Sequence, residues 1–329
     1  MYTVEILNAI RAGASTEYQT RVPAATQTNI DSVGNAILSY TNTYEEFTNT
    51  LINKIGLTVF VNKMAKNRLA KFKKGLMPYG KDVEEIFVEM ATAEGAFDTT
   101  GANPLGRRES DVKVMYHREN RKDKYVKSLS KAQVKTAFRS ADGVTELLSM
   151  IVNAIYSGAN QDEYLIMKEL LAKYELNYFD YEVLEITDDP ASALDFIKTV
   201  RKAVQDVSFV SPTYNKAGVQ TFCDKEDLVL LVNKDVMAHT DVDVLAKAFN
   251  LGKTDFEPEI IVLDNFGSMT DTYGVLVDKD FFMVYDTLIE VADILNPDGL
   301  FRNYFFHVHQ ILSTSQFKTA VRFKKQIVV

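Results

Sequence analysis

The stretch DGVTELLSMIVNAIYSGANQDEYLIMKELLAKYEL, residues 142–176, decides how the rest of the chain can be arranged. Its apolar residues recur at spacings of three and four, which predicts one long helix over about 141–176. Asp142 is a suitable N-cap residue, and Gly158–Asn160 marks a point where the helix can bend. At 1.5 Å per residue, such a helix is about 50 Å long, which is long for a compact domain.

Strands and shorter helices are predicted on both sides of this helix. On its N-terminal side, the apolar spacing predicts a helix over 31–55 capped by Asp31, and LTVFV at 57–61 has the composition of a strand. On its C-terminal side, a helix is predicted from Asp189 and Pro190, and a second, short one over 242–250. Four runs there predict strands: YFDYEVLEI (178–186), LVLLV (228–232), EIIVL (259–263) and YGVLV (273–277). Together they indicate an α/β block near 190–285.

Two hairpins are predicted outside this block. DVEEIFVEM at 82–90 and VKVMYH at 112–117 predict paired strands, with a loop over 97–110. The whole of 57–127 therefore indicates an extended β arm that has no apolar core of its own. Near the end of the chain, the turn residues NPDG at 296–299 predict a second long hairpin, which a last short strand follows. The predicted fold class is α+β.

Charge is distributed unevenly along the chain. The formal net charge is -8, but residues 60–139 carry +8 and residues 224–300 carry -12. Within the basic segment, Arg68–Lys81 holds four lysines and one arginine and no acidic residue. An asymmetry of this size indicates an interaction surface, either for nucleic acid or for an acidic neighbour.

The sequence supports no enzyme chemistry and no cofactor. GANPLGRR at 101–108 has glycine spacing but lacks the Lys-Ser/Thr pair of a phosphate-binding loop. His307 and His309 share one strand face and are better explained as packing residues than as half of a metal site. The single cysteine, Cys223, is expected to be structural. No signal peptide and no run of roughly eighteen apolar residues is present, so we expect a protein made inside the cell with no membrane partner.

Six blocks of sequence resemble the major capsid protein of the phi-29-like group of short-tailed phages. They occur in the family's order and at similar intervals: KFKKGLMPYGKDVEEIF (71–87), VKTAFRS (134–140), SMIVNAIYSGANQDEYLIMK (149–168), DVDVLAKAFN (241–250), VLVDKDFFMVYD (275–286) and NPDGLFRNYFFHV (296–308). Some relatives continue into an immunoglobulin-like domain. This chain stops at Val329, so no such domain is expected from it.

The resemblance implies the Hong Kong 97-type capsid fold and a shell built of pentamers and hexamers. By this reading 1–56 is an N-terminal arm, 57–127 an extended loop and 128–187 a peripheral domain with the spine helix. An axial domain then covers 188–285, and 286–329 returns as a hairpin that completes the peripheral domain, whose sheet takes residues from 110–127 and 286–329. The implied partners are other copies of the chain, a scaffolding protein, a portal protein and packaged double-stranded DNA. The implied place is the virion, after synthesis and assembly in the bacterial cytoplasm.

The basic cluster has two interpretations under this resemblance. Six residues are candidates for contacts between subunits: Lys71, Lys73, Lys74, Lys81, Arg107 and Arg108. Residues 224–300 of an adjacent subunit are the expected acidic counterpart. The alternative is that these residues face DNA, so that the chain is a nucleic-acid-binding structural protein acting through 60–139. The overall pI of about 5.2 argues against this as the main role.

Overall fold

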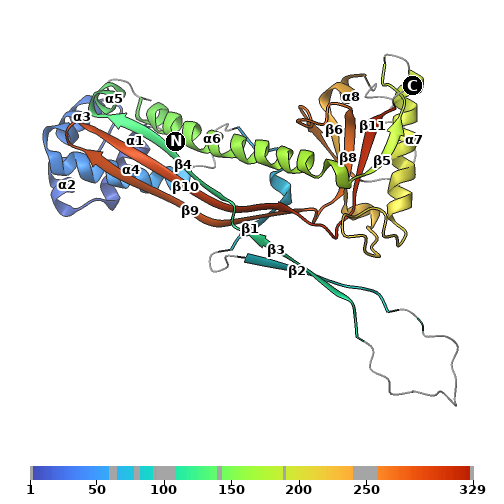
Figure 1. The fold of residues 1–329 in the computed structure, drawn as a ribbon. Helices are drawn as coiled ribbons and strands as arrows, with labels where there is room; N and C mark the ends of the chain where they lie inside the picture. The colour runs from blue at the N-terminus through green and yellow to red at the C-terminus, as the bar shows by residue number, and fades with distance from the viewer. Residues whose placement is uncertain are drawn as a thin grey trace. The chain divides into compact units, whose positions relative to one another are not determined.

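The computed structural model describes residues 3–58, 65–77, 82–91, 93, 109–138, 143–187, 190–239 and 258–326. The chain divides into two compact units. The first unit contains 1–67, 122–163 and 288–309, and the second contains 68–121, 164–287 and 310–329. The long helix and the long strands of the terminal hairpin each contribute one part to each unit (Figure 1).

The first unit packs helices on one face of long strands. Its helices are α1 Thr3–Gly13, α2 Thr16–Arg21, α3 Ile30–Ser39, α4 Thr41–Thr58, α5 Lys131–Ala137 and the first part of α6 Gly143–Lys173. Figure 1 shows α1–α5 gathered at one end of strands β4, β9 and β10. The buried core joins side chains from all of these elements, among them Ile10, Phe47, Ile151 and Phe306.

The N-terminal region differs from the sequence prediction in two ways. The single helix predicted over 31–55 is wrong, because α3 and α4 are separate helices that meet at Tyr40, whose backbone is extended at φ -126° and ψ 136°. Helices α1 and α2 were not predicted. Ser15 caps α2 by accepting a hydrogen bond from the backbone of Tyr18. Leu57 and Thr58 end α4 rather than begin the predicted strand, whose other residues lie outside the described ones.

The long helix predicted over 141–176 is confirmed as α6. It has 31 residues and is about 46 Å long. Gly158 lies inside one uninterrupted helix. Buried residues of the N-terminal part, such as Ile151 and Ile155, belong to the core of the first unit. Met167 and Leu171 in the C-terminal part belong to a core of the second unit. The predicted cap, Asp142, lies outside the described residues.

Four strands form a sheet in the order β1-β9-β10-β4. They are β1 Lys73–Leu76, β9 Phe282–Asn296, β10 Phe301–Thr314 and β4 Arg121–Ser130. The predicted terminal hairpin is confirmed as β9 and β10. In its turn, Asn296 accepts hydrogen bonds from the backbone amides of Asp298 and Gly299 at 3.0 and 3.2 Å.

A five-stranded sheet in the second unit has the order β5-β11-β8-β6-β7. Its strands are β5 Phe179–Val183, β6 Leu228–Asn233, β7 Glu259–Leu263, β8 Thr272–Asp278 and β11 Ala320–Lys325, and helices α7 Pro190–Val207 and α8 Lys234–His239 accompany them. Alternate residues of β8 enter two different cores, since Val275 and Val277 pack towards α6 and Leu276 packs with α7. Burial on both faces explains why these strands are continuous apolar runs.

Two further parts of the sequence prediction can be compared with the strands. The last strand, β11, pairs with β5 and β8, in a different sheet from β9 and β10. The strands predicted at 82–90 and 112–117 are confirmed as β2 Asp82–Val88 and β3 Val112–Arg118, which form a two-stranded antiparallel sheet. The loop over 97–108, the cap Asp189 and the helix over 242–250 lie outside the described residues.

The end of α6 is tied to the end of β7 by an ion pair. Lys168 is only 6% exposed, and its Nζ lies 2.8 and 2.9 Å from the two carboxylate oxygens of Asp264. The hydroxyl of Tyr164 donates a second hydrogen bond to Asp264. Burial raises the pKa of Asp264, but the hydrogen bonds from Lys168 and Tyr164 outweigh burial and lower this pKa to about 2.

One prediction concerns the packing of Gly34 in α3. A Cβ atom at Gly34 would lie 2.5 Å from Cγ of Phe138, which is buried and packs against Phe47. We expect Gly34→Ala to lower the free energy of unfolding by about 1–3 kcal/mol through overpacking, despite the better helix propensity of alanine. Gly158→Ala is the control, because its Cβ would lie 3.5 Å from Tyr125. Equal urea midpoints for the two variants would contradict the packing described.

A second prediction concerns acid stability. Because the folded pKa of Asp264 lies below the unfolded value of about 4, its carboxylate stabilises the fold above pH 4, and this stabilisation is lost as the pH falls towards 2. We expect Asp264→Asn to be less stable than the parent chain at pH 7, with a gap that narrows between pH 4 and pH 2. Urea unfolding as a function of pH measures the gap. The control is Glu169→Gln, which removes an exposed pair with Lys173 and should leave stability nearly unchanged. A gap for Asp264→Asn that does not vary with pH would contradict this account.

Candidate assembly surface

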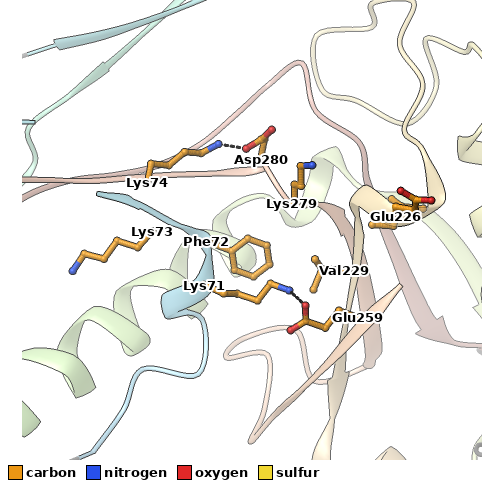
Figure 2. A pocket seen from close by; sticks show the side chains of 10 residues that line it. Lys71, Phe72, Lys73, Lys74, Glu226, Val229, Glu259, Lys279 and Asp280 are labelled. Atoms are coloured by element: carbon orange, nitrogen blue, oxygen red, sulfur yellow. Dashed lines mark hydrogen bonds and ion pairs between the residues drawn. The ribbon is translucent and has the colours of Figure 1, made fainter. Parts of the chain in front are cut away.

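The lysines of the basic cluster that the structure describes all meet acidic side chains. Lys71 pairs with Glu259 of β7, and Lys74 pairs with Asp280 in the turn between β8 and β9 (Figure 2). Lys73 points away from Lys71 and Lys74 (Figure 2), and its Nζ lies 3.0 Å from Oδ1 of Asp286. Lys73 and Lys74 are successive residues of β1, so their side chains leave from opposite faces. Lys71 comes before β1.

The segment that carries these lysines is anchored by Phe72. This residue ends the short 3-10 helix η1 Ala70–Phe72, is 2% exposed, and packs its ring 4.9 Å from that of Phe282. Gly75 follows in β1 with a φ of +104°, a conformation that residues with a side chain rarely adopt. The buried aromatic ring and the glycine together fix where Lys71 and Lys74 leave the backbone.

A pocket of about 480 Å³ lies between these lysines and their acidic partners. It is lined by Lys71, Phe72, Lys73, Lys74, Glu226, Leu228, Val229, Glu259, Lys279 and Asp280. Burial raises the pKa of Asp280, but the hydrogen bond from Lys74 and the charges of Lys74 and Lys318 outweigh burial and lower it. The ten lining residues include no serine, cysteine or histidine, and two of the lysines, Lys71 and Lys74, are held in ion pairs.

A buried polar chain connects β1 to the other strands of its sheet. Oδ1 of Asp286 accepts from Lys73 at 3.0 Å and from Nε2 of Gln310 at 2.7 Å. Oε1 of Gln310 accepts in turn from Nη1 of Arg121 at 2.6 Å. Gln310 is fully buried, and Arg121 and Asp286 are 4% and 6% exposed. We call these four residues, Lys73, Asp286, Gln310 and Arg121, the root network, since they cross-link β1, β9, β10 and β4.

A second set of hydrogen bonds holds the sheet of β2 and β3 beside the root network. His117 of β3 is 1% exposed, and its Nδ1 lies 2.7 Å from the hydroxyl of Ser313. Its Nε2 lies 3.1 Å from Oε2 of Glu85 on β2. The other oxygen of Glu85 accepts from the hydroxyl of Ser315 at 2.6 Å. On the same face, Phe87 stacks on Phe317 at 5.7 Å between ring centroids.

The opposite face of β2 and β3 carries five exposed apolar side chains beside Asp82, Glu84 and Arg118. In the antiparallel register Ile86 lies opposite Val114, and Val88 lies opposite Val112. These four side chains are between 43% and 57% exposed, and Tyr116 beside them is 56% exposed. We call β2 and β3 together the ribbon, and these five side chains its open face. A two-stranded sheet is marginally stable on its own and needs a further layer to cover an apolar face.

The structure describes three of the six predicted site residues. Lys71, Lys73 and Lys74 meet acidic residues of 224–300, as the charge pattern suggested, but these acids belong to the same chain. Their role between subunits stays a prediction. Lys81, Arg107 and Arg108 lie outside the described residues.

Sequence reasoning missed the open face and the root network. The alternation of apolar residues at 86 and 88 and at 112 and 114 was the available signal for the open face. No sequence signal links Gln310 to Arg121, which are 189 positions apart.

Other candidate chemistry is absent from the part of the chain that the structure describes. No three His, Cys, Asp or Glu side chains gather there as a metal site. Cys223 is buried and unpaired, and burial raises the pKa of its thiol. His307 and His309 lie on the half-buried face of β10, where His307 stacks near Phe305. None of the helices in these residues is both long enough and apolar enough to cross a bilayer.

Comparisons with known proteins agree with this architecture. The chain is 39% identical to the major capsid protein of Bacillus phage B103 over 97% of its own length and 72% of that protein. It is 38% identical to the major capsid protein of Bacillus phage PZA, over 97% of its own length and 72% of that protein.

Solved phage capsids share the fold at low sequence identity. The capsid structure of Staphylococcus phage Andhra aligns with a TM-score of 0.66 at 13% identity, over 81% of this chain and 86% of that one. The capsid structure of cyanophage P-SCSP1u aligns with a TM-score of 0.53 at 10% identity, over 82% and 91% of the two chains.

The fold is therefore the α+β, Hong Kong 97-type fold of phage capsid proteins. The model of the Phi29-like phage major capsid protein family matches residues 7–324 of this chain. On that match and on the identity with two capsid proteins, the chain belongs to the family of Phi29-like phage major capsid proteins and is a shell-forming protein of the virion of a tailed phage.

Proposed function

We propose that copies of this chain join into rings of five and six that close into a shell, and that the ribbon is the main contact between neighbouring copies. The observation that carries the proposal is the open face. Ile86, Val88, Val112, Val114 and Tyr116 are about half exposed in the chain by itself. An exposed apolar surface of this kind marks a site that another molecule covers.

The free energy expected from covering the open face is small for one contact, as in a shell that repeats the contact many times. Covering a half-exposed aliphatic side chain contributes about 1 kcal/mol, so the open face contributes on the order of 5 kcal/mol before the costs of association. One such contact is weak. In a closed ring every copy gives its ribbon to one neighbour and receives another, so the contacts support one another.

Hydrogen bonds on the other face of the ribbon hold it in place before subunits associate. His117 and Glu85 attach the ribbon to Ser313 and Ser315, and the root network lies where β4 begins, just after β3 ends. An interface element held in place before binding loses less entropy on association. The family resemblance supports the same assignment, with 57–127 as the extended loop that reaches a neighbour. It also supports the division into arm, spine helix, axial domain and return hairpin.

Further partners belong to the proposal through family membership alone. They are a scaffolding protein, a portal protein and packaged double-stranded DNA that the inner surface contacts without sequence specificity. Synthesis and assembly in the bacterial cytoplasm, and a structural role without enzymatic activity, belong to it in the same way. Nucleic-acid binding through 60–139 as the main function is less well supported, because Lys71, Lys73 and Lys74 are already paired with carboxylates.

A charge on the open face should block assembly without unfolding the chain. We expect Val114→Asp to fold normally, because Val114 is 43% exposed, and to lower the yield of shells at least about tenfold, because a carboxylate resists burial against apolar surface. Sedimentation and electron microscopy measure the yield, and circular dichroism monitors folding. The matched control is Leu194→Asp on α7, which is 41% exposed. Normal shells from Val114→Asp would refute the ribbon contact.

A charge swap decides where the lysines act. If Lys71 pairs with Glu259 inside one chain, both Lys71→Glu and Glu259→Lys should lower shell yield or stability, and the double variant should restore them. Mixing the two single variants should then restore nothing. If the pair forms between neighbouring subunits, the mixture should also assemble well. Lys74 and Asp280 provide the same comparison at a second pair.

Lys73 is best left unchanged in this experiment, because its partner Asp286 is buried and reversing the charge there would destabilise the fold itself.

A further inference from the structure

Strand β9 has an uncovered edge in the first unit. It lies between β10 and β1, but β1 pairs with it only at Val284 and Asp286. From Leu288 to Asn296, no strand of the described residues lies on the side away from β10. We call residues 288–296 the β9 edge. An uncovered edge presents a row of backbone N–H and C=O groups that another strand can bind.

The β9 edge also lacks the residues that usually protect a strand edge, which are above all lysine and proline. The opposite edge of the same sheet has them, since β4 carries the exposed residues Lys122, Lys124 and Lys127. The β9 edge contains no lysine, arginine or proline. Of its two acidic residues, Asp293 is bound by Arg302. One edge of the sheet is therefore protected against a further strand, and the other is not.

The side chains of the β9 edge are mostly apolar and partly uncovered. Leu288, Ile289 and Ile294 are 37%, 48% and 59% exposed. Val291 packs against the core of the first unit, so alternation along the strand places Leu288 and Ile294 on the opposite, outer face. A long apolar edge of this kind is a site at which a partner strand extends the sheet.

The residues of the β9 edge are complementary to themselves. In an antiparallel pair centred on Val291, Leu288 of each copy lies opposite Ile294 of the other. A pair centred one residue earlier places Glu290 opposite Glu290, and a pair centred two residues later places Asp293 opposite Asp293. Like charges directly opposite each other are destabilising. A pair centred one residue later places Glu290 opposite Ile294, so the register about Val291 is the favourable one.

A shell built of rings needs contacts that join one ring to the next. An isologous contact, in which the same surface of two copies meets itself, can join two rings. We propose that the β9 edges of two copies pair antiparallel about Val291 and join neighbouring rings. This inference rests on the proposed function, which supplies the rings. It uses none of the residues of the ribbon, which joins copies within a ring.

Paired cysteines test the register in assembled shells of the full-length chain. After mild oxidation, Leu288→Cys/Ile294→Cys should give at least about tenfold more disulfide-linked dimer than either single variant, because only the double variant places two thiols opposite each other. Six residues of a strand span roughly 20 Å, which excludes a bond within one chain. The matched control is Leu288→Cys/Ala292→Cys, whose cysteines meet only in the register centred on Glu290. The native Cys223 is 3% exposed and gives little background.

A lysine on the β9 edge tests its role in joining rings. We expect Ile294→Lys to protect this edge as β4 is protected, so that rings form normally while the yield of closed shells falls at least about tenfold. The control is Val126→Lys, because Val126 is 45% exposed on the edge that already carries lysines, and it should assemble like the parent chain. Electron microscopy counts rings and shells.

Three results would each overturn the inference: shells of Leu288→Cys/Ile294→Cys without the disulfide, equal amounts of dimer from the control pair, or equal shell yields from Ile294→Lys and Val126→Lys. Loss of shells in Ile294→Lys without the disulfide in the double variant would assign the β9 edge to a different strand, and would overturn it too. Failure of the proposed function looks different, since the parent chain would then form neither rings nor shells. Shells that lack the disulfide contradict only the pairing of β9 edges.

Discussion

The described architecture depends most on the hydrogen-bonded charges of the root network. Asp286 is buried between Lys73 and Gln310, and Gln310 is buried against Arg121. Removing one partner from such a network is costly, because a buried charge is then left without compensation. The network cross-links four strands that are far apart in sequence. The ribbon begins shortly after β1 and ends just before β4, so these bonds also determine where the ribbon leaves the second unit.

The same hydrogen bonds that stabilise the fold also position the ribbon that we propose for assembly. The ribbon has one face held by His117, Glu85 and Phe87, and an opposite face on which the five apolar side chains of the open face are exposed. A chain that covered both faces itself would gain stability and lose the contact surface that we propose. Lys71, which precedes β1, and Lys74 of β1 follow the same logic, since their pairs with Glu259 of β7 and with Asp280 after β8 hold the segment before the ribbon on the five-stranded sheet. Under the proposed contact, the ribbon would need little further ordering when subunits join.

Sequence patterns predicted the elements better than they predicted their partners. The helix α6, both hairpins and the strands β6, β7 and β8 follow from local periodicity and composition, because burial on one or two faces leaves a direct trace in the sequence. The break at Tyr40 was missed because the apolar spacing continues across it. Helices α1 and α2 were missed because short helices depend on tertiary packing more than on their own sequence.

The candidate surface was predictable only in part. Charge counts named the acidic region 224–300 of a neighbouring subunit as the counterpart of the lysines, which stays a prediction, because charge counts carry no information about whether the acids belong to the same chain or to its neighbour. The partner of β11 was missed for a related reason, since strand pairing is a long-range property that local patterns do not encode. The open face, in contrast, was visible as alternation in two short segments, and its exposure became evident only when the register of β2 and β3 was known.

The most direct test of the central claim is to compare the reactivity of a cysteine on the open face before and after assembly. Ile86→Cys introduces a thiol at a site that is 57% exposed, while the native Cys223 is 3% exposed and gives little background. If neighbouring copies cover the ribbon, maleimide labelling of Cys at this position should be fast in the unassembled chain and at least about tenfold slower in closed shells. Equal labelling rates in the two states would contradict the claim that the ribbon is the contact between subunits.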